Sequence, residues 1–237
     1  MDVAIIAAMD EEMATLRGKL EAAEAAAGPG ADLPIYQGRM QELDIVIVRC
    51  GIGKVNAALA AQYTIDHFKP KAILTSGVAG ALSPLVGVGD IIIATGAQQH
   101  DFDARGFGYA RGVIPRLPVS LFPCDPRLVE LAVEAAEHAG DLRVHQGLVV
   151  SGDLFVSSPQ QKQEILEFFP EALCADMETA SIAQVAALNN VPFLSIQTIS
   201  DAADEQAAQS FYQTLDDVLA QLNSVVEKLL EALKGRF

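Results

Sequence analysis

The stretch Val3–Ala8, with the sequence VAIIAA, is followed by Met9 and then by three acids, Asp10, Glu11 and Glu12. A continuous apolar run of this length is typical of a strand that is buried on both faces of a sheet. The acids suit the first turn of a helix, because the helix dipole stabilises negative side chains there. A buried strand that passes directly into a helix indicates an α/β fold.

The same alternation of strand and helix continues along the chain. Further strands are expected at 43–48, 72–74, 90–93, 147–150, 172–175 and 192–196, and helices at 55–68, 126–138, 159–168, 177–188 and 210–233. This order predicts a largely parallel sheet with helices on both faces. No internal repeat or linker divides the chain, so a single domain over residues 1–237 is expected.

Composition excludes several classes of function. The chain has 16 basic and 31 acidic residues, a net charge of −15, and such a field repels nucleic-acid phosphates and anionic membranes. The four His and three Cys are too few and too scattered for a zinc framework, and an odd number of Cys fits a reducing compartment. No signal peptide and no run of 18 apolar residues is present, so a cytoplasmic protein without a membrane span is predicted.

Three acidic clusters follow expected strands, namely Glu11–Glu12, Asp176–Glu178 and Ser200–Asp201. Each alone is explained by the helix dipole. Ligands of α/β proteins, however, bind at the carboxyl ends of strands, where one pocket would collect all three clusters. Asp201 also lies among apolar neighbours, so burial is expected to raise the pKa of its carboxyl group.

Two glycine-rich stretches, Gly51–Lys54 and Ser76–Gly80, are expected to be turns. Neither is a phosphate-binding Walker loop, because Val55 stands where Ser or Thr must follow the lysine. Phe155 by itself predicts a core aromatic residue. A stretch Ala25–Pro34 is the clearest loop.

His100 and Asp101 could form a catalytic pair, but no Ser or Cys nucleophile signature accompanies them. A structural hydrogen bond is therefore the expected role. They lie in an irregular segment, Gln98–Pro123, whose length is typical of a functional or docked loop. Its four aromatic residues are expected to pack on a partner, or alternatively to fold back on their own chain: Phe102, Phe107, Tyr109 and Phe122.

Nine segments in unbroken order carry a resemblance to a known family. They are Ile5–Met13, Cys50–Ala58, Gly77–Gly80, Gly89–Ile91, His100–Asp101, Phe107–Tyr109, Ser151–Phe155, Asp176–Ala180 and Ile199–Asp204. Together they resemble the 5′-methylthioadenosine/S-adenosylhomocysteine nucleosidases of the nucleoside phosphorylase fold family. The resemblance implies a three-layer α-β-α fold with a central mixed, largely parallel twisted sheet.

It also implies hydrolysis of the N-glycosidic bond of an adenosine thioether, giving adenine and a 5-thioribose, with no cofactor and no metal. Asp201 matches the family's general acid for adenine N7, and Ser200 orients it. Glu12 matches the base that activates water, and Glu178 the carboxylate that binds the ribose hydroxyls. Glycosidases use carboxyl groups in the same way, because one is held protonated while others are ionised.

The resemblance assigns binding residues as well. Phe155 would stack on adenine, and the backbone of Val156 would read its edge. The apolar residues that would line the ribose and alkylthio pocket are Met9, Ile52, Met177 and Phe211. In the homodimer that the resemblance implies, Phe107, Tyr109 and Pro115 would reach the neighbouring subunit's active site.

The chain departs from the family at two positions near the water and the ribose. Val78 stands where the family usually has Ser, and Gln197 where it has Arg. Loss of the arginine removes a positive charge beside Glu12 and Glu178, so these carboxylates are less strongly held ionised.

Three alternatives to this nucleosidase remain open. A related enzyme could act on a futalosine-type nucleoside in menaquinone synthesis. A phosphorylase would need arginines on the glycine turns to hold phosphate, where only Lys54 and the nearby Arg49 are available. A non-catalytic binding protein would be expected to lack Glu12, Glu178 or Asp201, and all three are present.

Overall fold

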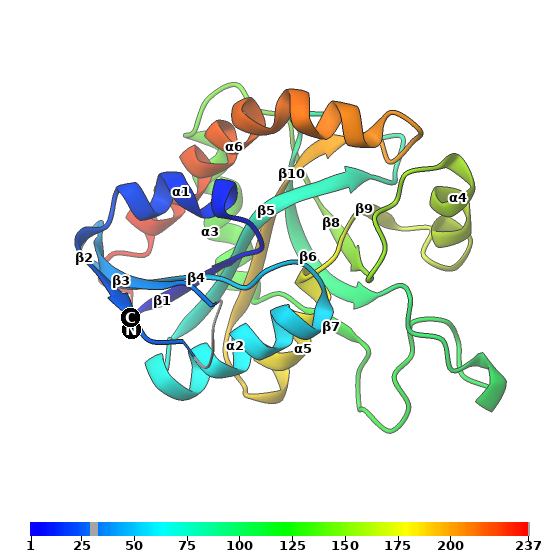
Figure 1. Ribbon diagram of the computed structural model, residues 1–237, viewed down its shortest axis with the longest axis horizontal. Coiled ribbons are helices and arrows are strands. Elements are labelled where there is room, and N and C mark those ends of the chain that lie inside the picture. Colours follow the sequence, from blue (N-terminus) through cyan, green and yellow to red (C-terminus); the bar gives the residue numbers. More distant parts are fainter. Residues whose placement is uncertain (29–32, 237) are drawn as a thin grey trace.

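The first strand, β1 (Val3–Ala7), is buried on both faces, as its sequence predicts. It pairs in parallel with β4 (Leu43–Arg49) on one side and with β5 (Ala72–Ala81) on the other. The computed structural model describes residues 1–28 and 33–236 (Figure 1). In that part of the chain, the ten strands form one mixed sheet.

The sheet has the order β10-β6-β8-β9-β5-β1-β4-β3-β2, and β7 pairs with β6. Because β10 also pairs with β5, the strands from β10 to β5 close into a ring, and the rest of the sheet extends from β5. The remaining strands are β2 (Glu21–Ala26), β3 (Ile35–Met40), β6 (Ile91–Gln99), β7 (Leu121–Pro123), β8 (Val144–Ser151), β9 (Ala172–Asp176) and β10 (Phe193–Asp201).

Helices cover the sheet on two sides, which confirms the predicted three-layer α/β fold (Figure 1). One layer holds α1 (Asp10–Gly18), α3 (Pro126–Glu137) and α6 (Ala207–Ala232). The other holds α2 (Lys54–Phe68) and α5 (Thr179–Leu188), which pack on each other. A sixth helix, α4 (Pro159–Phe168), lies apart from both layers.

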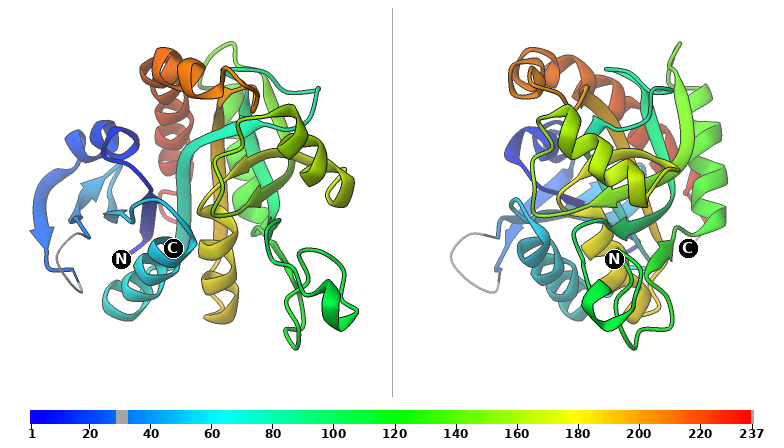
Figure 2. Two further views of the ribbon diagram at one scale, coloured as in Figure 1. Left: turned by 45° about the vertical axis from the view of Figure 1, so that its right-hand side comes forward. Right: turned by 90° about the vertical axis from the view of Figure 1, so that its right-hand side faces the viewer.

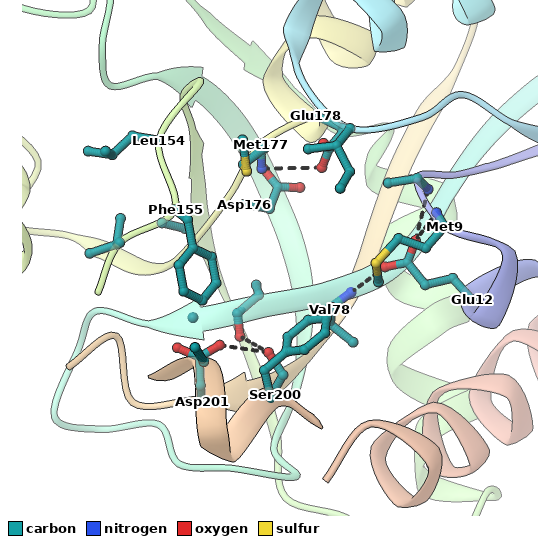
Figure 3. Close-up of a pocket in the computed structure, with 18 of the residues that line it drawn as sticks. Met9, Glu12, Val78, Leu154, Phe155, Asp176, Met177, Glu178, Ser200 and Asp201 are labelled. Atoms are coloured by element: carbon teal, nitrogen blue, oxygen red, sulfur yellow. Dashed lines mark hydrogen bonds between the residues drawn. The ribbon is translucent and has the colours of Figure 1, made fainter. Parts of the chain in front are cut away.

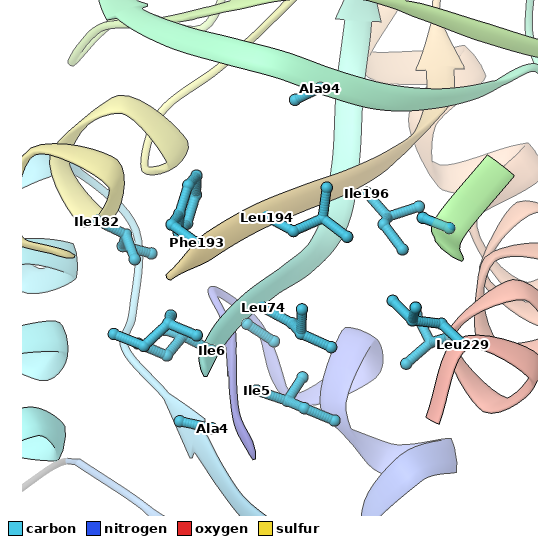
Figure 4. Packing of buried hydrophobic residues seen from close by; sticks show 14 of the residues in the cluster. Ala4, Ile5, Ile6, Leu74, Ala94, Ile182, Phe193, Leu194, Ile196 and Leu229 are labelled. Atoms are coloured by element: carbon cyan, nitrogen blue, oxygen red, sulfur yellow. The ribbon is translucent and has the colours of Figure 1, made fainter. Parts of the chain in front are cut away.

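Buried strands with apolar residues on both faces form the core. On β10, Phe193 faces α5 and Ile182, whereas Leu194 faces α6 and Leu229 (Figure 4). Complete burial of one such side chain contributes about 1.5–3 kcal/mol. This two-sided packing explains why the central strands are continuous apolar runs and do not alternate.

The prediction of a turn at Ser76–Gly80 is wrong, because this segment belongs to β5. Its glycines are required by side chains that approach the strand closely. A Cβ at Gly77 would lie 2.6 Å from Oε1 of Glu12, and one at Gly80 would lie 3.1 Å from Oδ1 of Asp201. These glycines therefore make room for two acids and do not bend the chain.

The loop predicted at Ala25–Pro34 begins too early, since β2 continues to Ala26. Residues 29–32 of that prediction lie outside the described residues. Neither β2 nor β3 was expected. The sequence of β2, EAAEAA, is exposed at the edge of the sheet and has no strand-like alternation of apolar and polar residues.

Most of the segment Gln98–Pro123 is irregular, as predicted, with a short 3₁₀ helix at Arg105–Phe107. It projects from the body of the molecule (Figure 2, green). Phe107 is 87% exposed, but Phe122 is buried in β7, so the expectation that all four aromatic residues face a partner is wrong for Phe122.

Candidate functional site

A cavity of about 430 Å³ opens at the carboxyl ends of the central strands, and the three acidic clusters meet there (Figure 3). The sequence predicted this convergence. The lining residues come from the ends of six strands or the segments that follow these strands, and from the start of α6: Ala8, Met9, Glu12, Ile52, Val78, Ala79, Gly80, Leu154, Phe155, Val156, Ala175, Asp176, Met177, Glu178, Ser200, Asp201, Ala208, Phe211 and Tyr212.

Glu12, in the first turn of α1, is held by three backbone amides. Its Oε2 accepts hydrogen bonds from Ala8 N at 2.8 Å and from Met9 N at 2.9 Å, and its Oε1 accepts one from Val78 N at 3.0 Å. Burial raises the pKa of Glu12 to about 7, which the three amides only partly offset. A fixed carboxylate with a pKa near neutrality is suited to accept a proton.

Glu178 immediately precedes α5 and accepts hydrogen bonds from Gly53 N at 2.6 Å and from Met177 N at 3.2 Å. The first of these bonds explains the close approach of the Gly51–Lys54 turn, which the structure places at the start of α2. Burial, and then the charge of nearby Asp176, raises the pKa of Glu178 to about 8.

Asp176 is a third buried carboxylate of the site that sequence reasoning placed in a cluster but did not assign a role. Its carboxyl group accepts hydrogen bonds from Ser151 Oγ and, at 3.1 Å, from Thr179 N. Burial raises its pKa. In the sequence, the position of Asp176 two residues before Glu178 indicates that it could belong to the site. Only the fold shows that its carboxyl group is buried in the wall of the same cavity.

Asp201 ends β10 on the opposite side of the cavity from Glu12 and Glu178 (Figure 3). Its Oδ2 accepts a hydrogen bond from Ser200 Oγ at 2.8 Å, and its Oδ1 accepts one from Ala203 N at 2.9 Å. Burial raises the pKa of Asp201, as the sequence predicted. A raised pKa keeps a carboxyl group protonated to higher pH, which suits it to donate a proton to a bound ligand.

The chain is also similar to known proteins. The model of the phosphorylase superfamily matches residues 2–231. The chain belongs to this superfamily. It is 39% identical to a 5′-methylthioadenosine/S-adenosylhomocysteine nucleosidase of Desulfotalea psychrophila, over 99% of both chains.

Solved structures of superfamily members agree with this chain over nearly their whole length. The nucleosidase of Neisseria meningitidis in complex with methylthio-immucillin-A is 38% identical, with a TM-score of 0.94, 98% of this chain covered and 99% of that one. A futalosine hydrolase of Helicobacter pylori is 29% identical, with a TM-score of 0.91 and 98% of both chains covered. The resemblance stated from the sequence is thereby confirmed.

In this superfamily member, the wall of the cavity between the acids is apolar. Phe155 lies on that wall, 43% exposed, so the default expectation of a core residue is wrong. The other predicted lining residues, Met9, Ile52, Val78, Val156, Met177 and Phe211, also line the cavity. Sequence reasoning missed Leu154, Ala208 and Tyr212, since single residues beside a motif carry no signal of their own.

Gln197 does not line the main cavity. It lies in a second, much smaller cavity of about 20 Å³, together with Glu12, Asp176 and Glu178. Its Nε2 donates to Thr179 Oγ1 at 2.9 Å and more weakly to Asp176 Oδ2 at 3.4 Å. Gln197 therefore contributes a dipole to the three carboxylates, but no charge.

Phe107, Tyr109 and Pro115 lie outside the cavity of their own chain. They belong to the projecting segment, which begins near an ion pair between Asp101 and Lys54 at 2.6 Å. Asp101 also accepts a hydrogen bond from Asp153 N at 3.0 Å, so this residue has the expected structural role. Nε2 of His100, in contrast, is buried and has no hydrogen-bond partner among the described residues.

No lysine, arginine or histidine lines the main cavity in residues 1–28 and 33–236. In the same residues, no group of three His, Cys, Asp or Glu side chains could hold a metal ion. Among the helices of residues 1–28 and 33–236, none combines the length and the apolar composition that a membrane span requires.

Proposed function

We propose that this superfamily member hydrolyses the N-glycosidic bond of 5′-methylthioadenosine and S-adenosylhomocysteine, releasing adenine and the corresponding 5-thioribose. The observation that carries the proposal is the placement of acidic residues at two opposite ends of one apolar cavity. Asp201 and Phe155 lie at one end, and Glu12 and Glu178 at the other (Figure 3).

The chemistry requires both ends of the cavity. As the bond between the ribosyl carbon and purine N9 breaks, its electron pair moves to the purine and positive charge develops on the ribose. Asp201 gives its proton to purine N7, with Ser200 orienting the carboxyl group. Water attacks the ribosyl carbon and gives its proton to Glu12. Electrostatic stabilisation of the ribosyl cation by an ionised carboxylate parallels that in glycosidases.

The remaining residues bind the substrate in this proposal. Glu178 accepts hydrogen bonds from the ribose hydroxyls, Phe155 stacks on the purine, and the backbone of Val156 reads its edge. An alkylthio group needs apolar walls, and the cavity supplies them with side chains such as Met9, Ile52, Val78, Met177 and Phe211.

Hydrolysis is favoured over phosphorolysis by the charges around the cavity. Lys54 is engaged by Asp101 at 2.6 Å, and Arg49 lies 3.2 Å from Asp10, so both cations have other partners. A phosphate ion in the site would instead face the buried carboxylates of Glu12, Asp176 and Glu178.

The test is adenine release by the purified protein. Methylthioadenosine, adenosylhomocysteine and aminofutalosine are incubated in parallel, each with and without phosphate. We expect adenine from the first two at a rate that phosphate does not change. Faster release from aminofutalosine would replace this function by that of a futalosine-type nucleosidase, and ribose-1-phosphate products would show a phosphorylase.

We also propose that the chain is a single domain that acts as a homodimer with shared active sites, in the cytoplasm and in methionine salvage. Exposure of Phe107 on a projecting segment supports the dimer, because an apolar ring left in water is unfavourable. Phe107, Tyr109 and Pro115 would then close the partner's cavity over the alkylthio group.

A further inference from the structure

A cation on a separate helix contacts the turn that follows the proposed general acid, which ends β10. Lys162, on α4, is half-buried, and its Nζ donates a hydrogen bond to the backbone carbonyl of Ala202 at 3.0 Å. Ala202 follows Asp201 directly. Lys162 therefore joins α4 to the turn that carries the acid.

That turn is strained. Ala203 has a φ of 52°, in the left-handed region that costs a non-glycine residue about 1–2 kcal/mol. In this conformation, Ala203 N donates a hydrogen bond to Asp201 Oδ1 at 2.9 Å. The hydrogen bond from Lys162 to Ala202 is a second contact with the same turn. It stabilises the left-handed conformation of Ala203.

The connection also spans two walls of the cavity. The segment before α4 carries Phe155 and Val156, and the turn after β10 carries Asp201. In the proposed function, the first wall binds the purine and the second gives it a proton. Proton transfer depends on the relative position of the two walls, because a small displacement of a reacting group lowers the reaction rate strongly.

We propose that Lys162 is a positioning residue for the general acid: its ammonium group ties the Asp201 turn to α4 and stabilises the carboxylate that Asp201 becomes after it gives up its proton. This inference rests on the proposed function. The proton moves from Asp201 to the purine, and the negative charge left on Asp201 then lies near the positive charge of Lys162.

Electrostatics agrees with this geometry. Burial is the main cause of the raised pKa of Asp201, and the charge of Asp204 adds to it, whereas the charge of Lys162 lowers the pKa by a smaller amount. In turn, burial lowers the pKa of Lys162, and Asp204 and Asp201 raise it. Lys162 and Asp204 are therefore the charged groups that act on Asp201 from the elements around it.

The experiment compares Lys162→Met with Lys162→Arg, and uses Lys228→Met as a matched control. Lys228 lies far along α6 and pairs with Glu231 at 3.1 Å. For each variant, kcat and kcat/KM for methylthioadenosine are measured from pH 5 to 10, and thermal unfolding checks the fold.

For Lys162→Met we expect kcat to fall about tenfold and the alkaline limb of the pH profile to move up by roughly half a unit, because Asp201 loses a nearby positive charge. Lys162→Arg should keep kcat and the alkaline limb as in the wild-type protein. Lys228→Met should also change neither kcat nor the alkaline limb. A loss of activity with an unmoved alkaline limb would overturn the inference, since a merely structural contact has no effect on that limb.

A second measurement does not depend on turnover. With ¹³C-labelled aspartate, the Asp201 carboxyl resonance is assigned by its loss in Asp201→Asn and titrated in each variant. A higher pKa of Asp201 in Lys162→Met supports the inference, and an unchanged one overturns it. If the wild-type protein released no adenine, the proposed function would fail while this titration still tested the contact.

Discussion

The backbone amide of Val78 donates a hydrogen bond to Oε1 of Glu12 at 3.0 Å, although the two residues are 66 positions apart in the chain. The bond ties the first turn of α1 to the middle of β5. It can form because Gly77, next to Val78, has no side chain in the space that the carboxylate occupies.

Gly77→Ala should therefore displace Glu12. The added Cβ would lie 2.6 Å from Oε1, and the three amides that hold the carboxylate prevent a simple retreat. We expect kcat to fall roughly 10²-fold, as for a misplaced catalytic group. Gly18→Ala, where nothing lies within 4 Å of the added Cβ, is the matched control and should retain full activity. Equal activity in both variants would contradict the role of Glu12.

Asp201→Asn should abolish adenine release while adenine still binds. The amide keeps hydrogen bonds to Ser200 and the purine but has no acidic proton to give, and loss of a general acid costs about 10²- to 10⁴-fold. Kinetics and calorimetric titration with adenine measure the two effects. Asp217→Asn, at an exposed position of α6 outside the cavity, is the control. Activity of the Asp201 variant within threefold of wild type would show that another group is the acid.

Gln197→Arg should raise activity on methylthioadenosine and move the acid limb of the pH profile to lower pH. A guanidinium in place of the amide would lie among Glu12, Asp176 and Glu178, and its charge would lower the pKa of their carboxyl groups. Gln197→Met, similar in size but uncharged, should not move the limb. A loss of activity in the arginine variant alone would indicate that Gln197 is adapted to a different nucleoside.

Phe107→Ala should leave the protein dimeric but weaken its binding of methylthioadenosine, because the ring is expected to cover the alkylthio group of the partner's site. Sedimentation at micromolar concentration and KM measurements check the two parts. A monomer near 25 kDa with full activity would refute the shared site.

Stability should fall as the pH rises from about 4.5, where the carboxyl groups of Glu12 and Glu178 begin to ionise in the unfolded chain, to about 8, where both are ionising in the folded protein as well. The pKa of Glu12 is about 7 and that of Glu178 about 8 in the folded protein, above the value of 4.5 for an unperturbed glutamate. The folded state therefore binds these protons more tightly, and the stability that they contribute is present at low pH and lost as the carboxyl groups ionise. The total loss is on the order of a few kcal/mol.

Melting temperatures of wild type and Glu178→Gln across this range provide the measurement. The variant has one titrating group fewer, so its melting temperature should change less steeply with pH. Identical slopes would mean that Glu178 is not held with a raised pKa.

The sequence predicted an element correctly where residues close together in the chain determine its structure. The bounds of α4 were predicted correctly, because Ser158 caps the helix and Pro159 begins it. The prediction failed at Ser76–Gly80, because a glycine that makes room for a distant side chain has the same local signature as one that turns the chain. The edge strand β2 was missed for a related reason, since its pairing with β3 specifies it and its own composition does not.

The sequence by itself determined the α/β class, the order of most elements, and the acids that could form a site, because hydrophobic periodicity and short motifs are local properties. Only the tertiary structure decided which of these acids share a cavity and what that cavity does to them. Glu12 lies far along the chain from Asp176 and Glu178. The raised pKa values of all three arise first from burial, and the charge of Asp176 adds to the effect for Glu12 and Glu178. Both effects depend on distances in space, which the pairing of β1 and β9 with β5 sets and the order of residues does not.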